Sequence, residues 1–339
     1  MEPIVSSDEA KVQDYSRYGD VNDYIGSLKG DVFRDYRRRW HLASSMEKEF
    51  DFPLFLVFET MFKCNLKCTM CLHSSAGKKK YGYDGKLSFD KYKEIIREAS
   101  EYGCPSLTIG GTSEPLLDAR IADMISFANK SGFVDTMLNT NATLLTEDVG
   151  KALIEAELTR LRIGFDGATA ETYESIRVGA KYENVKENIL NFIELRNKMK
   201  SQFPIVRLSF VNLAANNSEL ESYVDFWKTV ADYVTIQRYK PHEFTEKRSW
   251  KLMGAGDSSI KNIKCSQPFE RVYIRGNGDV HACCSVVYGP KVGNVFETSI
   301  YEIWNSKKMK ELRKELKKGI IDKNPGCKKC MIESYGAEY

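Results

Sequence analysis

Apolar runs of strand length alternate with amphipathic helical stretches from Leu54 onward. Six of these runs have the length and apolar character of buried strands. They cover residues 54–60, 106–110, 133–140, 159–165, 205–211 and 233–237. The stretches between them begin at N-cap residues, such as Ser88 before 89–102 and Thr146 before 147–156. This alternation is typical of a parallel sheet covered by helices.

Six strand–helix units are two fewer than a closed eight-stranded barrel contains. The sequence therefore predicts an α/β fold with a partial (β/α)6 TIM-like barrel over residues 51–240. In such barrels the active site lies at the carboxyl ends of the strands. We expect residues 1–50 to form an N-terminal helical extension, in which the arginine-rich segment 34–40 is a solvated helix.

The regular alternation ends near residue 240. Residues 271–275 and 280–284 are predicted to be short strands, because a run of Gly, Asn and Asp turn residues separates them. One long helix is expected over 299–318, with its lysine-rich run as a solvated face. We therefore expect residues 241–339 to form a separate domain built from a β-hairpin and a helix.

Composition and charge exclude several classes of protein. The chain has 339 residues, 42% hydrophobic and 29% charged, which is the composition of a globular protein. A dispersed net charge of +3 gives no support for a nucleic-acid partner. Residues 1–5 lack the start of a secretory signal, and the apolar stretch 52–58 is too short to span a bilayer. We expect a cytoplasmic protein with no membrane contact.

The nine cysteines fall into two groups, at 64–71 and 265–330, with only Cys104 apart. A reducing cytosol keeps thiols free, so clustered cysteines there usually hold metal. The first group, Cys64, Cys68 and Cys71, follows the first predicted strand. Three thiolates would leave one iron of a 4Fe-4S cluster open to a ligand that is not protein. Zinc is the alternative, with His73 as the local fourth ligand.

This Cys-x3-Cys-x2-Cys loop after a first barrel strand resembles the signature of the radical S-adenosylmethionine (SAM) superfamily. The resemblance implies that SAM chelates the open iron and that an electron from the reduced cluster breaks its carbon–sulfur bond. The resulting 5′-deoxyadenosyl radical would abstract hydrogen from a substrate carbon. It also implies a protein reductant such as flavodoxin or ferredoxin.

Later motifs extend the resemblance. Residues 110–116 resemble the Gly-Gly-Glu-Pro turn that meets the SAM amino group, although Ser113 stands in place of a glycine. Residues 139–145 resemble the segment near the SAM ribose. Residues 164–167 and 173–179 resemble the Ser-x-Asp-Gly and Ile-Arg-x-Gly pair of the family, with glycine at 164 in place of serine.

The resemblance implies SAM-binding roles for Gly111, Thr112, Ser113, Glu114, Asn139, Asn141, Asp166 and Arg177. Arg177 would hold the SAM carboxylate, because a guanidinium pairs with a carboxylate through two parallel hydrogen bonds. Each residue also has a simpler interpretation when taken alone. Arg177 fits an exposed helix arginine, and Asp166 and Asn139 fit turn or capping residues.

The second group consists of Cys265, Cys283, Cys284, Cys327 and Cys330. A zinc ribbon could use the 283/284 pair together with Cys327 and Cys330. The segments 265–269, 274–283, 293–295 and 299–305 together resemble the SPASM/Twitch auxiliary-cluster domain, and the cysteine spacing is similar to the Twitch aminocyclitol dehydrogenase type.

That resemblance implies a second 4Fe-4S cluster on Cys265, Cys283, Cys327 and Cys330. Cys284 could replace Cys283, because neighbouring strand residues point to opposite faces. Four thiolates leave no open iron, so such a cluster would conduct electrons. This favours oxidation, in which a deprotonated substrate radical gives its electron to the cluster and becomes a ketone.

The preferred hypothesis is oxidation of an alcohol carbon in a small polyhydroxylated substrate: a sugar, cyclitol or nucleotide-sugar. This substrate class rests on analogy with Twitch relatives. The alternative is a peptide-modifying maturase or a radical epimerase, with Cys284 or Cys104 as hydrogen donor. Cys104 also fits a small buried hydrophobe. The fifty residues before the first strand look too short for a precursor-recognition domain.

A third possibility is a catalytically silent iron-sulfur or zinc-binding protein. The intact first cysteine group and Glu114 count against it. No base for the substrate hydroxyl is evident, since His41, His73, His242 and His281 are each expected to be structural.

Overall fold

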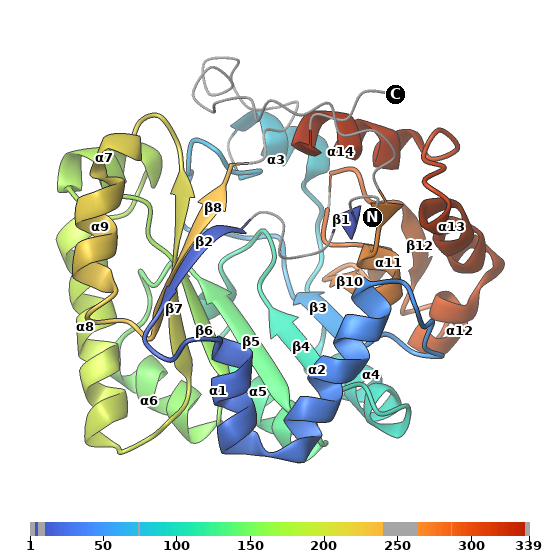
Figure 1. Ribbon diagram of the computed structural model, residues 1–339, viewed down its shortest axis with the longest axis horizontal. Helices are drawn as coiled ribbons and strands as arrows, with labels where there is room; N and C mark the ends of the chain where they lie inside the picture. The colour runs from blue at the N-terminus through green and yellow to red at the C-terminus, as the bar shows by residue number, and fades with distance from the viewer. Residues whose placement is uncertain (1–3, 6–10, 74, 240–263, 286, 336–339) are drawn as a thin grey trace.

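The computed structural model describes residues 4–5, 11–73, 75–239, 264–285 and 287–335. Its main feature is a ten-stranded sheet in the order β12-β11-β10-β3-β4-β5-β6-β7-β8-β2 (Figure 1). The six predicted barrel strands form its centre and pair in parallel, in chain order. They are β3 Phe55–Glu59, β4 Ser106–Ile109, β5 Asp135–Thr140, β6 Arg160–Gly164, β7 Ile205–Asn212 and β8 Tyr233–Arg238. The predicted partial barrel is confirmed.

Helices follow the barrel strands as the sequence predicts. The hydroxyl of Ser88 accepts from the backbone NH of Lys91, and that of Thr146 from Val149, so the predicted N-caps are present. The elements are α3 Ser75–Tyr81, α4 Phe89–Glu101, η1 Pro115–Leu117, α5 Ile121–Lys130, α6 Glu147–Glu155, α7 Ala170–Ile176, α8 Tyr182–Lys198, η2 Asn217–Glu219 and α9 Leu220–Trp227. No helix in the described part of the chain has the length and apolarity needed to cross a membrane.

The main core lies between the sheet and its covering helices. All five residues of β3 are buried. The ring of Phe58 on β3 packs edge-on against Tyr92 of α4, with ring centroids 4.9 Å apart. Strands buried on both faces are near-continuous apolar runs, which explains why the barrel strands could be recognised from the sequence.

The N-terminal extension contains helices α1 Val21–Lys29 and α2 Asp31–Ser44, but it is not wholly helical. Strand β2, Lys11–Ser16, pairs antiparallel with β8 and extends the sheet beyond the barrel. The short strand β1 Ile4–Val5 pairs in parallel with β9 Lys264–Cys265. The strand β2 was missed because its sequence, Lys-Val-Gln-Asp-Tyr-Ser, carries no run of apolar residues.

Helix α2 covers the interior of the curved sheet near the amino ends of the strands. Its buried Trp40 packs edge-on against Phe55 of β3, with centroids 5.8 Å apart. The exposed side of the helix carries the predicted solvated charges, including the i,i+3 ion pairs Arg34–Asp31 and Arg38–Asp35. Arg37 differs, because it lines a cavity inside the barrel.

The predicted hairpin is present and gains a third strand. It consists of β10 Arg271–Arg275, β11 Asp279–His281 and β12 Lys291–Asn294. Strand β10 also pairs in parallel with β3 over five residues, so the C-terminal hairpin continues the barrel sheet. Figure 1 shows these C-terminal elements gathered beside β3, across the molecule from α8 and α9. The expected boundary near residue 241 lies outside the described residues.

The single helix expected over 299–318 is wrong. The chain forms α12 Ile300–Asn305 and α13 Lys307–Lys317 instead. Ser306 between them is extended, with φ −59° and ψ 153°, and its hydroxyl accepts from the backbone NH of Met309. A serine that caps the second helix therefore ends the first. The described part of the chain also contains α11 Gln267–Glu270 and α14 Pro325–Tyr335.

Side chains and backbone groups fasten the C-terminal helices to the barrel. The indole NH of Trp304 in α12 donates to the carbonyl of Phe50, 2.7 Å away. The carboxylate of Glu98 in α4 accepts from the backbone NH groups of Ile300 and Tyr301 at the start of α12. A carboxylate at a helix N-terminus is favourable, since it satisfies free NH groups and the helix dipole.

Asp232, just before β8, ties several elements together. Its buried carboxylate pairs with the guanidinium of Arg196 on α8. It also accepts from the backbone NH of Val206 on β7, at 2.7 Å, and from the hydroxyl of Tyr18, at 2.9 Å. One carboxylate thus joins a helix, a barrel strand and the N-terminal extension.

We expect Asp232→Ala to lower the free energy of unfolding by about 3–5 kcal/mol, because it leaves the buried Arg196 charge without its partner. The matched control is Asp225→Ala, which removes an exposed ion pair with Lys228 and should cost at most about 1 kcal/mol. Anaerobic thermal unfolding of the two variants measures the difference. Equal unfolding midpoints would contradict the role given to Asp232.

Candidate functional site

A cavity of about 500 Å³ lies at the carboxyl ends of the barrel strands. Most of the residues predicted to bind the cluster and SAM meet in its wall. The lining includes Cys64, Cys68, Cys71, Gly111, Thr112, Ser113, Glu114, Asn139, Asn141, Arg177 and Cys284. Parallel strands bring segments far apart in the sequence to one edge, which is why the motifs converge.

The three cysteines of the first group lie close to one another, with Cys68 buried and Cys64 and Cys71 partly buried. Burial, together with the neighbouring thiolates of Cys68 and Cys64, raises the pKa of Cys71 to about 11. Burial also raises the thiol pKa of Cys64 and of Cys68. Thiols with a raised pKa stay protonated on their own. Coordination to the iron of a cluster stabilises the thiolate, so the cluster would favour loss of each proton.

Two hydrogen-bond donors point at the sulfur atom of Cys64. The backbone NH of Leu66 lies 3.5 Å from Cys64 Sγ, and the side-chain amide of Asn141 lies 3.9 Å from the same atom. Donors of this kind orient cluster ligands and tune the cluster's potential. The donor set therefore fits the 4Fe-4S cluster that the sequence predicts.

Glu114 is buried and accepts three hydrogen bonds from the chain. One oxygen accepts from the hydroxyl of Thr140, at 2.7 Å, and from the backbone NH of Leu116, at 3.0 Å. The other accepts from the backbone NH of Asn141, at 2.7 Å. Glu114 thereby holds the turn after β4 against the end of β5, in addition to facing the cavity.

Asn139 and Asn141 fix the neighbouring loop. The Asn139 side-chain amide donates to the carbonyl of Gly110, 2.7 Å away. The Asn141 amide donates to the side-chain oxygen of Asn65 in the cysteine loop, 2.9 Å away. The segments after β3, β4 and β5 are therefore joined by side-chain hydrogen bonds around the cavity.

Arg177 is nearly enclosed and not an exposed helix arginine. Its Nε and Nη2 both donate to one oxygen of the buried Asp166, at 2.7 and 2.6 Å. The other oxygen of Asp166 accepts from the backbone NH of Val211. Asp166 thus stands behind Arg177, which faces the cavity.

Glycine at position 164 makes room for this arginine. A Cβ at Gly164 would lie 2.2 Å from Arg177 Nη2, so the guanidinium occupies the space that a side chain would need. The departure from the family's serine thus has a steric reason. In the proposed role, Arg177 would bind the carboxylate group of SAM here without the help of a serine at position 164.

A second polar network joins the SAM turn to the C-terminal hairpin. Glu59 at the end of β3 accepts from the hydroxyl of Thr112, at 2.6 Å, and from the hydroxyl of Tyr273 on β10. Burial raises the pKa of Glu59. A Cβ at Gly111 would lie 2.0 Å from the Tyr273 hydroxyl, so glycine is required for this approach. Neither Glu59 nor Tyr273 was predicted from the sequence, since neither belongs to a recognised motif.

The second cysteine group also gathers in space. Burial raises the pKa of Cys283 well above its usual value, and thiolates at Cys284, Cys265, Cys330 and Cys327 add to the effect. Such mutual repulsion identifies these thiols as neighbours. Cys283 Sγ also lies against Gly289, where a Cβ would come within 2.6 Å of the sulfur.

The two adjacent cysteines have different surroundings. Cys283 lies among the other thiols of its group, whereas Cys284 is exposed and lines the cavity beside the first cysteine group. This division favours Cys283 as the fourth ligand and leaves the Cys284 thiol facing the cavity. The strand alternation expected over 280–284 is not the cause, because β11 ends at His281 and both cysteines lie in the bend that follows it.

Cys104 is not among the residues that line this cavity, so its position does not favour the role of hydrogen donor. It precedes β4, at the amino end of the barrel, and its buried thiol donates to the carbonyl of Ser106 at 3.7 Å. Burial raises its pKa to about 12. Cys104 is a small buried side chain of the core, the simpler of its two interpretations.

The described histidines are structural or exposed. His73 stacks on Phe62, with ring centroids 4.2 Å apart, and burial lowers its pKa to about 4. The Nδ1 of His281 lies 2.8 Å from the carbonyl of Gly289. His41 is exposed on α2. His242 lies outside the described residues.

Two arginines were also missed, Arg162 on β6 and Arg207 on β7, and both line the cavity. A signal for them exists in the sequence. Each occupies a polar position that alternates with apolar residues, as in Leu161-Arg162-Ile163, and so faces the barrel interior. The apolar residues around each arginine predicted the strand, but the arginine itself was not identified as a site residue.

Residues 58–207 match the radical SAM superfamily. Residues 265–331 match SPASM, an iron-sulfur cluster-binding domain. The first match spans the barrel from β3 to β7, and the second spans the hairpin, α12, α13 and the second cysteine group.

Two curated relatives are similar to part of this chain. "Mycofactocin maturase MftC" of Mycobacterium tuberculosis is 28% identical over 59% of this chain and 48% of the relative. "Probable GTP 3′,8-cyclase" of Methanococcus maripaludis is 27% identical over 53% of this chain and 57% of the relative. The chain thus spans about half the length of the curated relatives it matches.

Two solved structures share the fold. BtrN in complex with AdoMet and 2-DOIA is 19% identical, covers 83% of this chain and 92% of its own, and has a TM-score of 0.52. Streptococcus suis SuiB bound to precursor peptide SuiA is 16% identical, covers 83% of this chain and 71% of its own, and has a TM-score of 0.61. Both likenesses concern the fold alone.

The fold, the cysteine loop and the matched domains define a class. Residues 58–207 form a radical SAM domain, and residues 265–331 form a SPASM iron-sulfur domain. Its cofactors are SAM and 4Fe-4S clusters, as the sequence predicts. Their individual ligands are proposals: Cys64, Cys68 and Cys71 for the first cluster, and Cys265, Cys283, Cys327 and Cys330 for the second.

The arrangement of the thiols suits clusters. Within the described residues, no three His, Cys, Asp or Glu side chains are grouped so as to hold a single metal ion. A cubane cluster does not require that convergence, because each thiolate binds a different iron.

Iron content of reconstituted variants tests the ligand assignment. Wild-type protein should bind about eight irons. Cys283→Ala should bind about four, because it removes a ligand of the auxiliary cluster, whereas the matched variant Cys284→Ala should keep about eight. The reverse result would make Cys284 the ligand. About four irons with one zinc in the wild type would refute the two-cluster assignment.

Proposed function

We propose that this protein is a radical SAM oxidoreductase that oxidises an alcohol carbon of a small polyhydroxylated substrate to a ketone. When bound, SAM and its cluster supply the radical that removes a hydrogen atom, and the auxiliary cluster supplies the acceptor for the second electron. The substrate loses one hydrogen atom, one proton and one electron in total.

The observation that carries this proposal is the position of Cys283 and Cys284. Consecutive Cα atoms lie about 3.8 Å apart. One peptide unit therefore connects the cavity wall, at Cys284, with the second thiol group, at Cys283. An electron acceptor held by Cys283 would lie next to the cavity in which a substrate radical forms.

The chain's own residues would position the reactants. Asp166 fixes the guanidinium of Arg177 toward the cavity, where it can pair with the SAM carboxylate. Glu114 holds the turn that would meet the SAM amino group, through its three hydrogen bonds. Orientation matters greatly here, because a primary carbon radical attacks the nearest bond.

A second candidate function is epimerisation. It is supported by the exposed thiol of Cys284 in the cavity wall, which could return a hydrogen atom to the opposite face of a substrate radical. A peptide substrate is the corresponding alternative to a sugar, since several relatives are named as maturases. The reductant, a flavodoxin or ferredoxin, is likewise a proposal.

Turnover in deuterated water separates these possibilities. Anaerobically reconstituted protein is incubated with SAM, reductant and candidate sugars, cyclitols, nucleotide-sugars or peptides, and products are weighed by mass spectrometry. Oxidation predicts loss of two hydrogens from the substrate and an equal yield of 5′-deoxyadenosine. Cys68→Ala is the inactive control, because it should form no 5′-deoxyadenosine.

Incorporation of one solvent deuterium without other change, lost in Cys284→Ser, would replace oxidation by epimerisation. Absence of 5′-deoxyadenosine from wild-type protein loaded with both clusters would instead support the catalytically silent alternative.

A further inference from the structure

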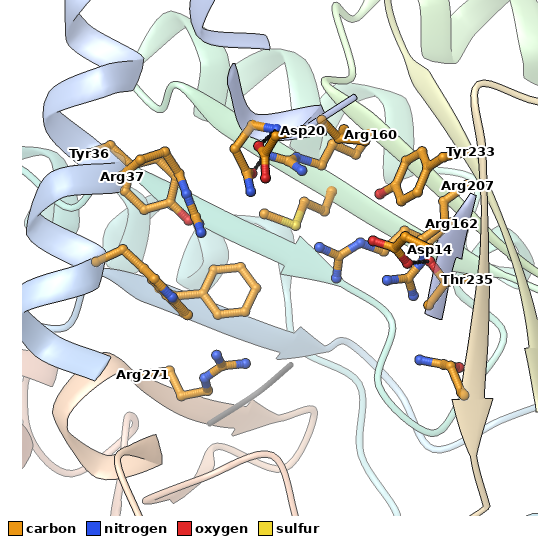
Figure 2. Close-up of a pocket in the computed structure, with 16 residues that line it drawn as sticks. Asp14, Asp20, Tyr36, Arg37, Arg160, Arg162, Arg207, Tyr233, Thr235 and Arg271 are labelled. Carbon is orange, nitrogen blue, oxygen red and sulfur yellow. Dashed lines mark hydrogen bonds between the residues drawn. The ribbon is translucent and has the colours of Figure 1, made fainter. Parts of the chain in front are cut away.

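Arg162 and Arg207 form a pair of like charges inside the barrel. They are register partners on the adjacent parallel strands β6 and β7, so their side chains leave the same face of the sheet. Neighbouring strands lie about 4.8 Å apart, which brings the two side chains together. Figure 2 shows the guanidinium groups side by side, pointing into the interior.

Neither arginine is paired in the way that nearby buried arginines are. Arg160 binds Asp135, Arg177 binds Asp166 and Arg196 binds Asp232. In the described part of the chain, no ion pair and no side-chain hydrogen bond joins the guanidinium of Arg162 or Arg207 to another residue. The Nε atom of each is buried without a hydrogen-bond partner.

The carboxylates nearest this pair form no direct ion pair with it in the described part of the chain. Asp14 of β2 lies beside it in Figure 2, and its carboxylate accepts from the hydroxyl of Thr235 at 2.7 Å. Asp135 pairs with Arg160 instead, its carboxylate accepting from the Arg160 Nε at 2.9 Å. Burial and the charge of Arg207 lower the pKa of Arg162 to about 10.

Both arginines open onto space that a ligand can fill. They line the 500 Å³ cavity of the candidate SAM site and also a second cavity of about 220 Å³ deeper in the barrel. The deeper cavity lies under the candidate SAM site. Three residues line both cavities: Arg162, Arg207 and Gln237. The two guanidinium groups therefore stand where these cavities meet.

Two unpaired cations held together in a low-dielectric interior cost free energy unless an anion joins them. Guanidinium groups bind phosphate and carboxylate oxygens through parallel hydrogen bonds. We propose that Arg162 and Arg207 together bind an anionic oxygen group of the substrate, a phosphate or a carboxylate. The substrate is therefore an acidic molecule, such as a sugar phosphate, a nucleotide-sugar or a sugar acid.

This inference rests on the proposed function in one respect, that the cavity receives the substrate. It adds the chemical class of that substrate and two residues that determine specificity. The SAM carboxylate is a competing occupant, because the same cavity is the candidate SAM site. The test must therefore measure SAM and the substrate anion separately.

Binding is measured without turnover, by anaerobic calorimetry on reconstituted full-length protein. The probes are inorganic phosphate, glucose 1-phosphate and glucuronate, with glucose as the uncharged comparison and SAM titrated separately. The variants are Arg162→Gln and Arg207→Gln. Arg38→Gln is the matched control, since it removes one exposed arginine from α2.

We expect wild-type protein to bind at least one anionic probe more tightly than glucose. Each cavity variant should weaken that binding about ten- to a hundredfold, and Arg38→Gln should leave it unchanged. SAM affinity should stay within about threefold in all variants. Thermal stability without anion should not fall in Arg162→Gln, because no protein partner is lost and one repulsion is removed.

Two results would overturn the proposal. One is that no anionic probe binds wild-type protein more tightly than it binds the cavity variants. The other is an equal loss of SAM affinity, which would assign the arginines to the SAM carboxylate. The phosphate and glucuronate titrations distinguish the two kinds of anion.

The outcome is independent of the oxidation reaction. Anion binding without any sugar oxidation would refute the proposed oxidation alone. Oxidation of neutral and acidic sugars with equal efficiency would refute the arginine site alone.

Discussion

The parallel pairing of β10 with β3 is the constraint on which the rest of the structure depends. Five residue pairs, from Arg271 opposite Phe55 to Arg275 opposite Glu59, join the C-terminal hairpin to the first barrel strand. The first cysteine loop follows β3, and the second cysteine group surrounds the hairpin. The register of two adjacent strands therefore fixes the spacing between the two thiol groups.

Polar contacts at the ends of these strands make the junction more rigid. Glu59 at the end of β3 binds Tyr273 of β10 and Thr112 of the turn after β4. A buried network is costly when one member is missing, so it favours a single arrangement of its parts. The hairpin thus takes part in shaping the candidate SAM site as well as carrying its own thiols.

The interior of the barrel combines opposite electrostatic environments within one cavity system. Near the carboxyl ends of the strands, the thiols of the first group favour a metal cluster. Glu114 in the same region accepts hydrogen bonds from neighbouring NH and OH groups. Deeper inside, Arg162 and Arg207 favour an anion. A substrate that carries its anionic group toward the arginines would turn its other end toward the candidate SAM site. Such polarity would select one orientation of the substrate.

The sequence predicted the six barrel strands because they are buried on both faces and therefore appear as apolar runs. It predicted the site residues of the motifs because cluster chemistry imposes a fixed cysteine spacing. Strand β2 and the pairing of β10 with β3 were not predictable, since long-range strand pairing leaves little trace in local sequence.

The positions of several single side chains also could not be predicted from local sequence. Whether Cys283 or Cys284 faces the other thiols depends on the bend that follows β11, and the sequence left that choice open. Cys104 looked available for chemistry until the structure put it at the amino end of the barrel. Ser306 was overlooked because a serine inside a helical pattern can be either a surface residue or a cap.

The most direct test of the central claim is a crystal structure of the anaerobic, reconstituted protein with SAM, in which anomalous scattering locates the iron atoms. The account predicts one iron cluster on Cys64, Cys68 and Cys71, a second on Cys265, Cys283, Cys327 and Cys330, and the free thiol of Cys284 between them in the cavity wall. A second cluster ligated by Cys284, or iron at the first group alone, would contradict it.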